Sequence, residues 1–170
     1  MFRKVLVAID QSDFGREVFR QALDLASAAH GELLLVHVLS TDEETAPRMP
    51  LSPILDYYPV LDDKPLRVFL EEWSEYEKEG RSLLDQYLAE AQEAGVAVES
   101  RQPTGSAGKQ LCEVAREWGA DLIVTGRRGR SGLSELVLGS VSNYVMHHAP
   151  CAVLVVPRTI GVDTAAPQTR

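Results

Sequence analysis

The 170-residue sequence predicts an α/β fold: an open, mostly parallel five-stranded sheet with helices on both faces, of the Rossmann-like kind. Short apolar runs recur along the chain, and most are unbroken rather than alternating, which is typical of strands buried on both faces of a sheet. Segments with the period of a helix separate these runs. Strand and helix therefore alternate up to a final strand, which is the order of an open sheet with right-handed crossovers.

The expected strands lie at residues 5–9, 33–39, 122–124 and 153–156, with a weaker fifth candidate at 96–100 within GVAVES. The first helix follows the first strand, where Ser12 or Asp13 could cap it and Gly31 stops it. Its apolar stripe consists of Phe14, Val18, Ala22, Leu25 and Ala29.

The longest helical pattern runs from Phe69 to Ala94, with Pro65 near its start and Gly95 at its end. Its apolar positions are Phe69, Trp73, Tyr76, Gly80, Leu83, Tyr87, Leu88, Ala91 and Ala94. A third helix is expected over Ala107, Leu111, Val114, Ala115 and Trp118, followed by Gly119, and a fourth over Val141, Tyr144, Val145 and His148, closed by Pro150.

The length of the chain predicts one domain over residues 1–157 and a mobile tail at 158–170. The segment 41–65 holds five of the nine prolines together with leucines and tyrosines, so this insert is either a functional flap or disordered, and its apolar content favours the flap. No apolar run approaches the roughly 20 residues of a membrane span, and the N-terminus enters strand-like sequence at once. We therefore expect a cytoplasmic protein that does not interact with membranes.

A formal net charge of −8 argues against a surface that coats nucleic acid. Against this acidic background, Arg127, Arg128 and Arg130 form a local positive cluster that suits a small anionic ligand, unless they are only solvated loop side chains. Cys112 and Cys151 have no metal-binding or redox spacing and lie in apolar surroundings, which indicates buried, reduced thiols.

Ligands of open α/β sheets bind beyond the carboxyl ends of the strands, and three features of the stretch TGRRGRSGLSELVLGSVS at 125–142 suit an anion there. Gly126 and Gly129 permit close backbone approaches. Gly139 and Ser140 mark the start of the fourth helix, where unpaired N–H groups and the dipole favour an anion. Ser140 and Ser142 add hydroxyls. Each feature alone suits a plain turn or cap, but their combination favours a nucleotide site.

Gly126, two residues, Gly129, nine residues and Gly139-Ser140 together resemble the glycine signature of the nucleotide-binding branch of the universal stress protein family. The segments KVLVAIDQS, LLLVHV, GADLIVTG and VSNYVMHHAPCAVLVV extend the resemblance over nearly the whole chain. It implies the fold of the adenine nucleotide alpha hydrolases. One departure from the family pattern is Ala152, where proline is usual, and it affects the last strand rather than the site.

The resemblance also implies an adenine-nucleotide site that takes ATP, or AMP or ADP, with Mg2+. The adenosine pocket would contain Ala8, Ile9, Asp10 and Val38, with Val38 against the adenine. Thr125, Gly126, Arg128 and Gly129 would surround the ribose and phosphates. Gly139, Ser140, Val141 and Ser142 would hold the phosphate tail.

Other candidate sites are weaker. The stretch GSAGKQ at 105–110 lacks the first glycine and the final Ser or Thr of a P-loop, so we interpret it as the entry to the third helix. His147 and His148 point about 100° apart on a helix, which suits a charge at the helix end better than a metal site. His37 is interpreted as a core histidine, and the carboxylates at 71–79 and 90–93 as a solvated face.

Three functions remain open from the sequence. The favoured one is a nucleotide-dependent regulatory or stress-response protein that binds ATP with slow or no hydrolysis and signals to an unknown partner protein. The second is a slow ATPase or autophosphorylating enzyme in which Ser140 or Ser142 accepts phosphate, although no Walker lysine or water-positioning base is evident. The third is a nucleotide-free protein-interaction module.

The last strand predicts the assembly. If Val153, Leu154, Val155 and Val156 lie at the edge of the sheet, their unpaired backbone groups favour pairing with a second copy. A two-fold homodimer would close that edge, as is usual in the family that the chain resembles.

Overall fold

The computed structural model describes residues 2–41, 46–48, 64–127 and 139–157. Five strands form one sheet in the order β3-β2-β1-β4-β5, and every neighbouring pair is parallel. The strands are β1 (Lys4–Ile9), β2 (Glu32–His37), β3 (Ala97–Arg101), β4 (Leu122–Gly126) and β5 (Ala152–Val156). The helices are α1 (Gly15–Ala28), α2 (Lys64–Glu93), α3 (Ala107–Trp118) and α4 (Ser140–His148). The predicted fold class and elements are confirmed, including the weaker strand candidate.

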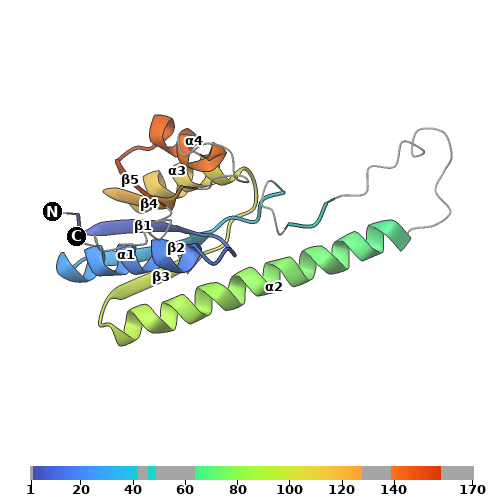
Figure 1. The fold of residues 1–170 in the computed structure, drawn as a ribbon, viewed down its shortest axis with the longest axis horizontal. Coiled ribbons are helices and arrows are strands. Elements are labelled where there is room, and N and C mark those ends of the chain that lie inside the picture. Colours follow the sequence, from blue (N-terminus) through green and yellow to red (C-terminus); the bar gives the residue numbers. More distant parts are fainter. Residues whose placement is uncertain (1, 42–45, 49–63, 128–138, 158–170) are drawn as a thin grey trace, which may run out of the picture.

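Two helices cover each face of the sheet (Figure 1). On one face, α1 and α2 pack on alternate strand residues such as Val7, Leu35 and Val124. On the other, α3 and α4 pack on the intervening residues, such as Leu6, Leu34 and Ile123. The unbroken apolar runs of the sequence arise from this arrangement, because both faces of β1, β2 and β4 are buried.

The start of α1 differs from the prediction. Neither Ser12 nor Asp13 caps the helix; its N-cap residue is Phe14. The hydroxyl of Ser12 donates instead to Oδ1 of Asp10 at 2.6 Å, and the backbone N–H of Ser12 donates to the same oxygen at 3.1 Å. A serine hydroxyl can form a hydrogen bond either at a helix start or within a nearby turn, and here it forms one within the turn.

The end of α1 also differs. The left-handed residue is His30, with φ of 47°, rather than Gly31. Leu25, which the sequence places on the apolar stripe, is exposed. By contrast, α3 ends as predicted at Gly119, whose φ of 72° is the conformation that favours glycine after a helix. The helix α2 is followed by Gly95 in the same conformation, and Pro65 is its second residue.

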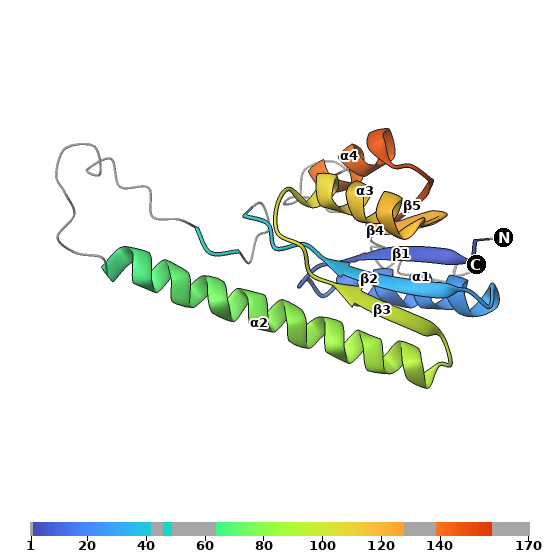
Figure 2. The ribbon, with the colours of Figure 1, turned by 180° about the vertical axis from the view of Figure 1, so that it is seen from behind.

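The 30 residues of α2 make it about 45 Å long at 1.5 Å per residue. Strands of five or six residues are less than half that length. As a result, α2 extends past the carboxyl ends of the strands in both views (Figures 1 and 2). Trp73 and Tyr76 pack with Leu39 and Ala46, and later residues of α2 pack on the sheet and on α1. Nearer the start of α2, Phe69 is buried whereas Leu66 and Leu70 are exposed.

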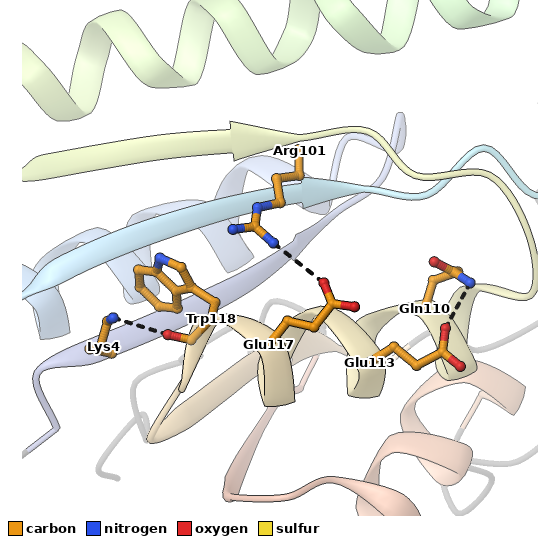
Figure 3. Close-up of polar contacts among 6 residues, drawn as sticks. All are labelled: Lys4, Arg101, Gln110, Glu113, Glu117 and Trp118. Atoms are coloured by element: carbon orange, nitrogen blue, oxygen red, sulfur yellow. Dashed lines mark hydrogen bonds and ion pairs between the residues drawn. The ribbon is translucent and has the colours of Figure 1, made fainter.

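The face of the sheet covered by α3 carries a row of polar contacts (Figure 3). Nζ of Lys4 donates to the backbone oxygen of Trp118 at 3.0 Å and lies 4.6 Å from the centre of the indole ring. Arg101, on the edge strand β3, lies 3.8 Å from the carboxylate of Glu117. The Lys4 contact attaches the end of α3 to β1, and the Arg101 contact joins α3 to the edge strand β3.

The predicted tail at 158–170 and most of the predicted insert at 41–65 lie outside the described residues. Among the residues that are described, no helix is both long enough and apolar enough to cross a membrane.

Candidate functional site

The strands β1 and β4 stop pairing before their carboxyl ends, and we call the opening between these strand ends the crevice. The partners of these two strands run only from Val5 with Leu122 to Val7 with Val124. On its other side, β1 stays paired with β2 as far as Ile9, and β4 stays paired with β5 as far as Gly126. The two strands therefore separate over their last residues. In the sheet, β2 and β3 lie on the far side of β1, and β5 lies on the far side of β4, so the strand order changes direction between β1 and β4. Open α/β sheets bind ligands at such a switch point.

One side of the crevice has an apolar floor. Ala8, Val38 and Val141 belong to the same cluster, although they come from β1, the end of β2 and the start of α4. Thr125 is buried, and it lies on this same face as Ala8 because side chains alternate along a strand. The structure thus places four predicted site residues on the same side of the sheet. Ile9 lies on the opposite face, in the core beneath α1 and α2, so it cannot share that floor.

The loop after β1 holds Asp10 at the mouth of the crevice. Its Oδ1 accepts the two hydrogen bonds from Ser12, and a β-carbon at Gly15 would lie 2.7 Å from its backbone oxygen. The next residue, Gln11, donates from Nε2 to the backbone oxygen of Tyr76 on α2 at 3.3 Å. These contacts fix the Asp10 carboxylate in place and connect its loop to α2.

Gly126 ends β4 on the other side of the crevice. A β-carbon there would lie 3.0 Å from Phe14 and 3.0 Å from Val18, both near the start of α1. Glycine is therefore required at position 126 because other atoms approach its backbone closely, as predicted. Those atoms belong to the side chains of Phe14 and Val18 and not to a ligand. Arg127 follows, and its backbone N–H donates to the oxygen of Val156 at 2.9 Å, which completes the pairing of β4 with β5.

The helix α4 begins at Ser140, as predicted, and its first turn supplies the donors. Gly139 is the N-cap residue with φ of −61° and ψ of 157°, and it provides no side-chain cap for the first amides. Ser142 is 1% exposed, and its hydroxyl donates to the oxygen of Gly139 at 3.0 Å, whereas Ser140 is exposed. A helix start without a side-chain cap, facing a crevice with an apolar floor, suits an anion linked to an apolar ring.

Two predicted site residues, Arg128 and Gly129, lie outside the described residues, as does Arg130. The structure adds residues that sequence reasoning missed: Ser12 and Gly15, which hold Asp10, and Phe14 and Val18, which pack on Gly126. Only the Asp-Gln-Ser pattern gave a local signal, because aspartate followed by serine two residues later is typical of a side-chain turn. The packing on Gly126 joins segments more than a hundred residues apart in the sequence.

A second groove, on α2, has the wrong charge for phosphate. Half of its lining residues are glutamates and one is a lysine: Pro47, Glu71, Glu72, Ser74, Glu75, Tyr76, Lys78 and Glu79. These carboxylates are exposed, as predicted for a solvated face. In the described ranges, no group of three or more His, Cys, Asp or Glu side chains is placed to hold a metal ion.

Two histidines and both cysteines are accounted for by local contacts or burial. His37 is fully buried and its Nδ1 accepts from Nε2 of Gln102 at 3.1 Å. His148 donates from Nδ1 to the oxygen of Tyr144 at 2.9 Å, close to the end of α4. Cys112 is buried and Cys151 is half-buried, and both are free thiols whose pKa is raised by burial. Burial of Cys151 is thus less complete than predicted.

Comparison with known proteins places the chain among close relatives. Residues 1–157 match the model of the universal stress protein family. The chain is 36% identical over 155 residues to universal stress protein Sll1388 of Synechocystis, covering 91% of this chain and 97% of that protein. It is 37% identical over 157 residues to universal stress protein YxiE of Bacillus subtilis, covering 92% and 99%.

Several solved structures share the fold. A universal stress protein in complex with cAMP matches with a TM-score of 0.60 and 26% identity, over 91% of this chain and 97% of that one. A family member from Arabidopsis thaliana with AMP bound matches with a TM-score of 0.61 and 21% identity, over 93% of each chain. The universal stress protein from Archaeoglobus fulgidus in complex with dAMP matches with a TM-score of 0.57 and 19% identity, over 91% of this chain and 97% of that one. At their lower identity, the last two show likeness of fold.

Proposed function

Because this chain belongs to the universal stress protein family, we propose that it is a regulatory protein of that family which binds an adenine nucleotide, ATP by preference, between β1 and β4. The observation that carries the proposal is the convergence of the separated strand ends with the first turn of α4. The complex of a relative with cAMP supports the choice of an adenine nucleotide.

Each part of the nucleotide has a suitable surface. The adenine ring would lie on the apolar floor of Ala8, Val38 and Val141. Asp10, held by Ser12, would accept hydrogen bonds from a ribose hydroxyl or the base. The phosphates would meet the first amides of α4. Several charge-assisted hydrogen bonds of about 1.5–3 kcal/mol each, added to burial of the ring, reach the roughly 8 kcal/mol of micromolar affinity.

The side chains beside the crevice also suit the binding of a nucleotide better than the direct binding of a metal ion. Mg2+ usually binds substrate phosphates, waters and only one or two carboxylates. Asp10 is the carboxylate that the crevice offers among the described residues, so Mg2+ would bind mainly through the phosphates of ATP.

We expect slow or no hydrolysis. The hydroxyl of Ser142 is buried and donates to Gly139, so it is poorly placed to accept a phosphoryl group. Ser140 is exposed and remains the better acceptor for the alternative, autophosphorylating function. Phosphate release faster than nucleotide exchange would favour that alternative. A cytoplasmic location and an unknown protein partner complete the proposal.

We further propose a homodimer through β5. The two sheet edges differ in character: β3 carries Glu99 and Arg101, and charges on an edge strand oppose pairing. The five residues of β5, AVLVV, carry no charge, and most are half-buried at the edge. An uncharged, β-branched edge is the one that favours pairing with a second copy.

The test uses Gly139, whose backbone conformation is accessible to any residue. Gly139→Asp adds a good helix cap and a negative charge at the phosphate position, so we expect unchanged or higher thermal stability together with at least about tenfold weaker binding of Mg-ATP by titration calorimetry. Gly139→Asn is the matched control: it caps the helix equally without the charge, and it should weaken binding less.

Two outcomes would overturn the proposal: full ATP affinity in Gly139→Asp, or a wild-type protein that binds no adenine nucleotide. Mass spectrometry of small molecules released by denaturing the purified protein gives an independent measurement. We expect an adenine nucleotide at up to one per chain. If the purified protein contains no nucleotide and its melting temperature does not change when Mg-ATP is added, the function as a nucleotide-free protein-interaction module would be favoured.

A further inference from the structure

The loop between β1 and α1 connects the crevice to α2. Asp10 lies at the mouth of the crevice, where two hydrogen bonds from Ser12 hold its carboxylate. The next residue, Gln11, donates from Nε2 to the backbone oxygen of Tyr76 on α2 at 3.3 Å. Neighbouring residues of one short loop therefore reach the proposed ligand site and the helix.

The end of β2 forms a second connection between the same two places. Val38 belongs to the apolar floor of the crevice, whereas the next residue, Leu39, belongs to the cluster that contains Tyr76. Consecutive side chains of an extended segment point to opposite sides, so the two residues can serve different neighbours. Leu39 is also fixed by its backbone, because its N–H donates to the oxygen of Pro103 at 2.8 Å and its oxygen accepts from Gly105 at 3.0 Å.

Both connections meet at Tyr76. This residue is 3% exposed, and its ring lies 5.8 Å from that of His37 and 5.5 Å from that of Trp73, measured between ring centres. Within the helix, the Tyr76 oxygen is also the acceptor for the amide of Gly80, four residues later. A closely packed side chain has few alternative positions, so a change in either connection alters the stability of this turn of α2.

We propose that this turn of α2, residues 76–80, responds to the occupancy of the crevice, and that Gln11 is the positioning residue that couples the two. This role rests on the proposed function, in which Asp10 and Val38 contact the ribose and the base. The phosphates would meet the first turn of α4, which packs on the opposite face of the sheet from α2. The turn therefore responds to the adenosine part of the ligand and not to the number of its phosphates.

The coupling is reciprocal, as linkage between two sites requires. A ligand that orders the loop strengthens the contact of Gln11 with Tyr76, and loss of that contact weakens the ligand. The net contribution of one neutral hydrogen bond corresponds to about two- to tenfold in affinity.

The experiment is amide hydrogen exchange of the full chain, followed by mass spectrometry, without ligand and with saturating Mg-ATP, adenosine or inorganic tripolyphosphate. In the wild type, we expect Mg-ATP and adenosine to slow exchange at residues 76–80 by at least about threefold. Tripolyphosphate should leave this exchange unchanged. The last turns of α2, residues 84–93, are an internal control and should exchange equally in all four samples.

Two variants test the connection through the loop. Gln11→Met keeps the length of the side chain and removes its donor, so it should lose most of the slowing even at saturating Mg-ATP, and bind ATP about two- to tenfold more weakly in calorimetry. Arg16→Met is the matched control. It removes a different contact between α1 and α2, the exposed 3.3 Å pair of Arg16 with Glu90, and should retain both the slowing and the affinity.

The outcomes separate this coupling from the proposed function. A wild-type protein that binds no adenine nucleotide in calorimetry would overturn both. Binding of ATP without slowing at residues 76–80 would overturn the coupling alone. Equal slowing in wild type and Gln11→Met, slowing by tripolyphosphate, or a lack of slowing by adenosine would do the same.

Discussion

Gly80 shows at the scale of one residue how α2 packs on the sheet. A β-carbon at Gly80 would meet the ring of His37 and, at 2.7 Å, Nε2 of Gln102. His37 is fully buried on β2, and Gln102 is bonded both to His37 and to the oxygen of Glu77. The glycine is therefore required by a close approach and not by its backbone conformation.

We expect Gly80→Ala to destabilise the protein by about 1–3 kcal/mol in urea unfolding, as overpacked core substitutions do. The opposing gain in helix propensity is only about 0.8–1.0 kcal/mol. Ser82→Ala, at an exposed position two residues later, is the control and should be neutral or slightly stabilising. A more stable Gly80→Ala variant would show that α2 does not pack closely on His37.

The two thiols predict how stability depends on pH. Burial raises the pKa of Cys112 and Cys151 above the ordinary 9.0, so the folded state retains these protons to higher pH than the unfolded state. The stabilising contribution is complete below pH 9 and is lost as the pH rises through the raised values. We expect the free energy of unfolding to fall above about pH 9, and to fall less steeply in Cys112→Ala/Cys151→Ala. Equal slopes would contradict this origin.

The pKa of Tyr87 is also raised, chiefly by burial, from an ordinary value of 10.0. This ring stacks on Phe19 with 4.3 Å between centroids. Its ionisation therefore continues the loss of stability at still higher pH, in both the wild type and the double variant.

At the scale of elements, the end of α3 is attached to β1 through Lys4 (Figure 3). The ammonium group contacts a helix C-terminal oxygen and the face of Trp118, two favourable sites for a cation. We expect Lys4→Met to cost about 1 kcal/mol in urea unfolding. Lys109→Met, which removes an exposed 3.8 Å pair with Glu113, should cost less than about 0.5 kcal/mol. Equal effects would show that the Trp118 contact adds nothing.

The sequence predicts elements better than the contacts between them. The end of α3 was predictable because Gly119 is a local signal, and the strands were predictable because their apolar runs require burial on two faces. The start of α1 was not, because the Ser12 hydroxyl had two local partners and the pattern does not show which one it takes. The separation of β1 from β4 depends on strand order, which no local pattern contains.

At the scale of the whole molecule, the contrast between the two edges of the sheet predicts its assembly. We expect Val155→Lys on β5 to convert the proposed dimer to monomers in light scattering, because a charge on the paired edge opposes association. Ser100→Lys on β3 is the control at the other edge, where Glu99 and Arg101 are already charged. Dimers that survive Val155→Lys but not Ser100→Lys would place the interface on β3.

The early separation of β1 from β4 has a consequence for how the molecule fluctuates. Beyond Val7 and Val124, the three strands on one side and the two on the other have no ladder joining them, so this end of the sheet is where transient opening costs least. A molecule bound to both β1 and β4 across this opening would hold the two groups of strands together. Amide hydrogen exchange at Ala8, Ile9 and Thr125 would then slow by more than exchange elsewhere in the core, and an empty protein would exchange there first.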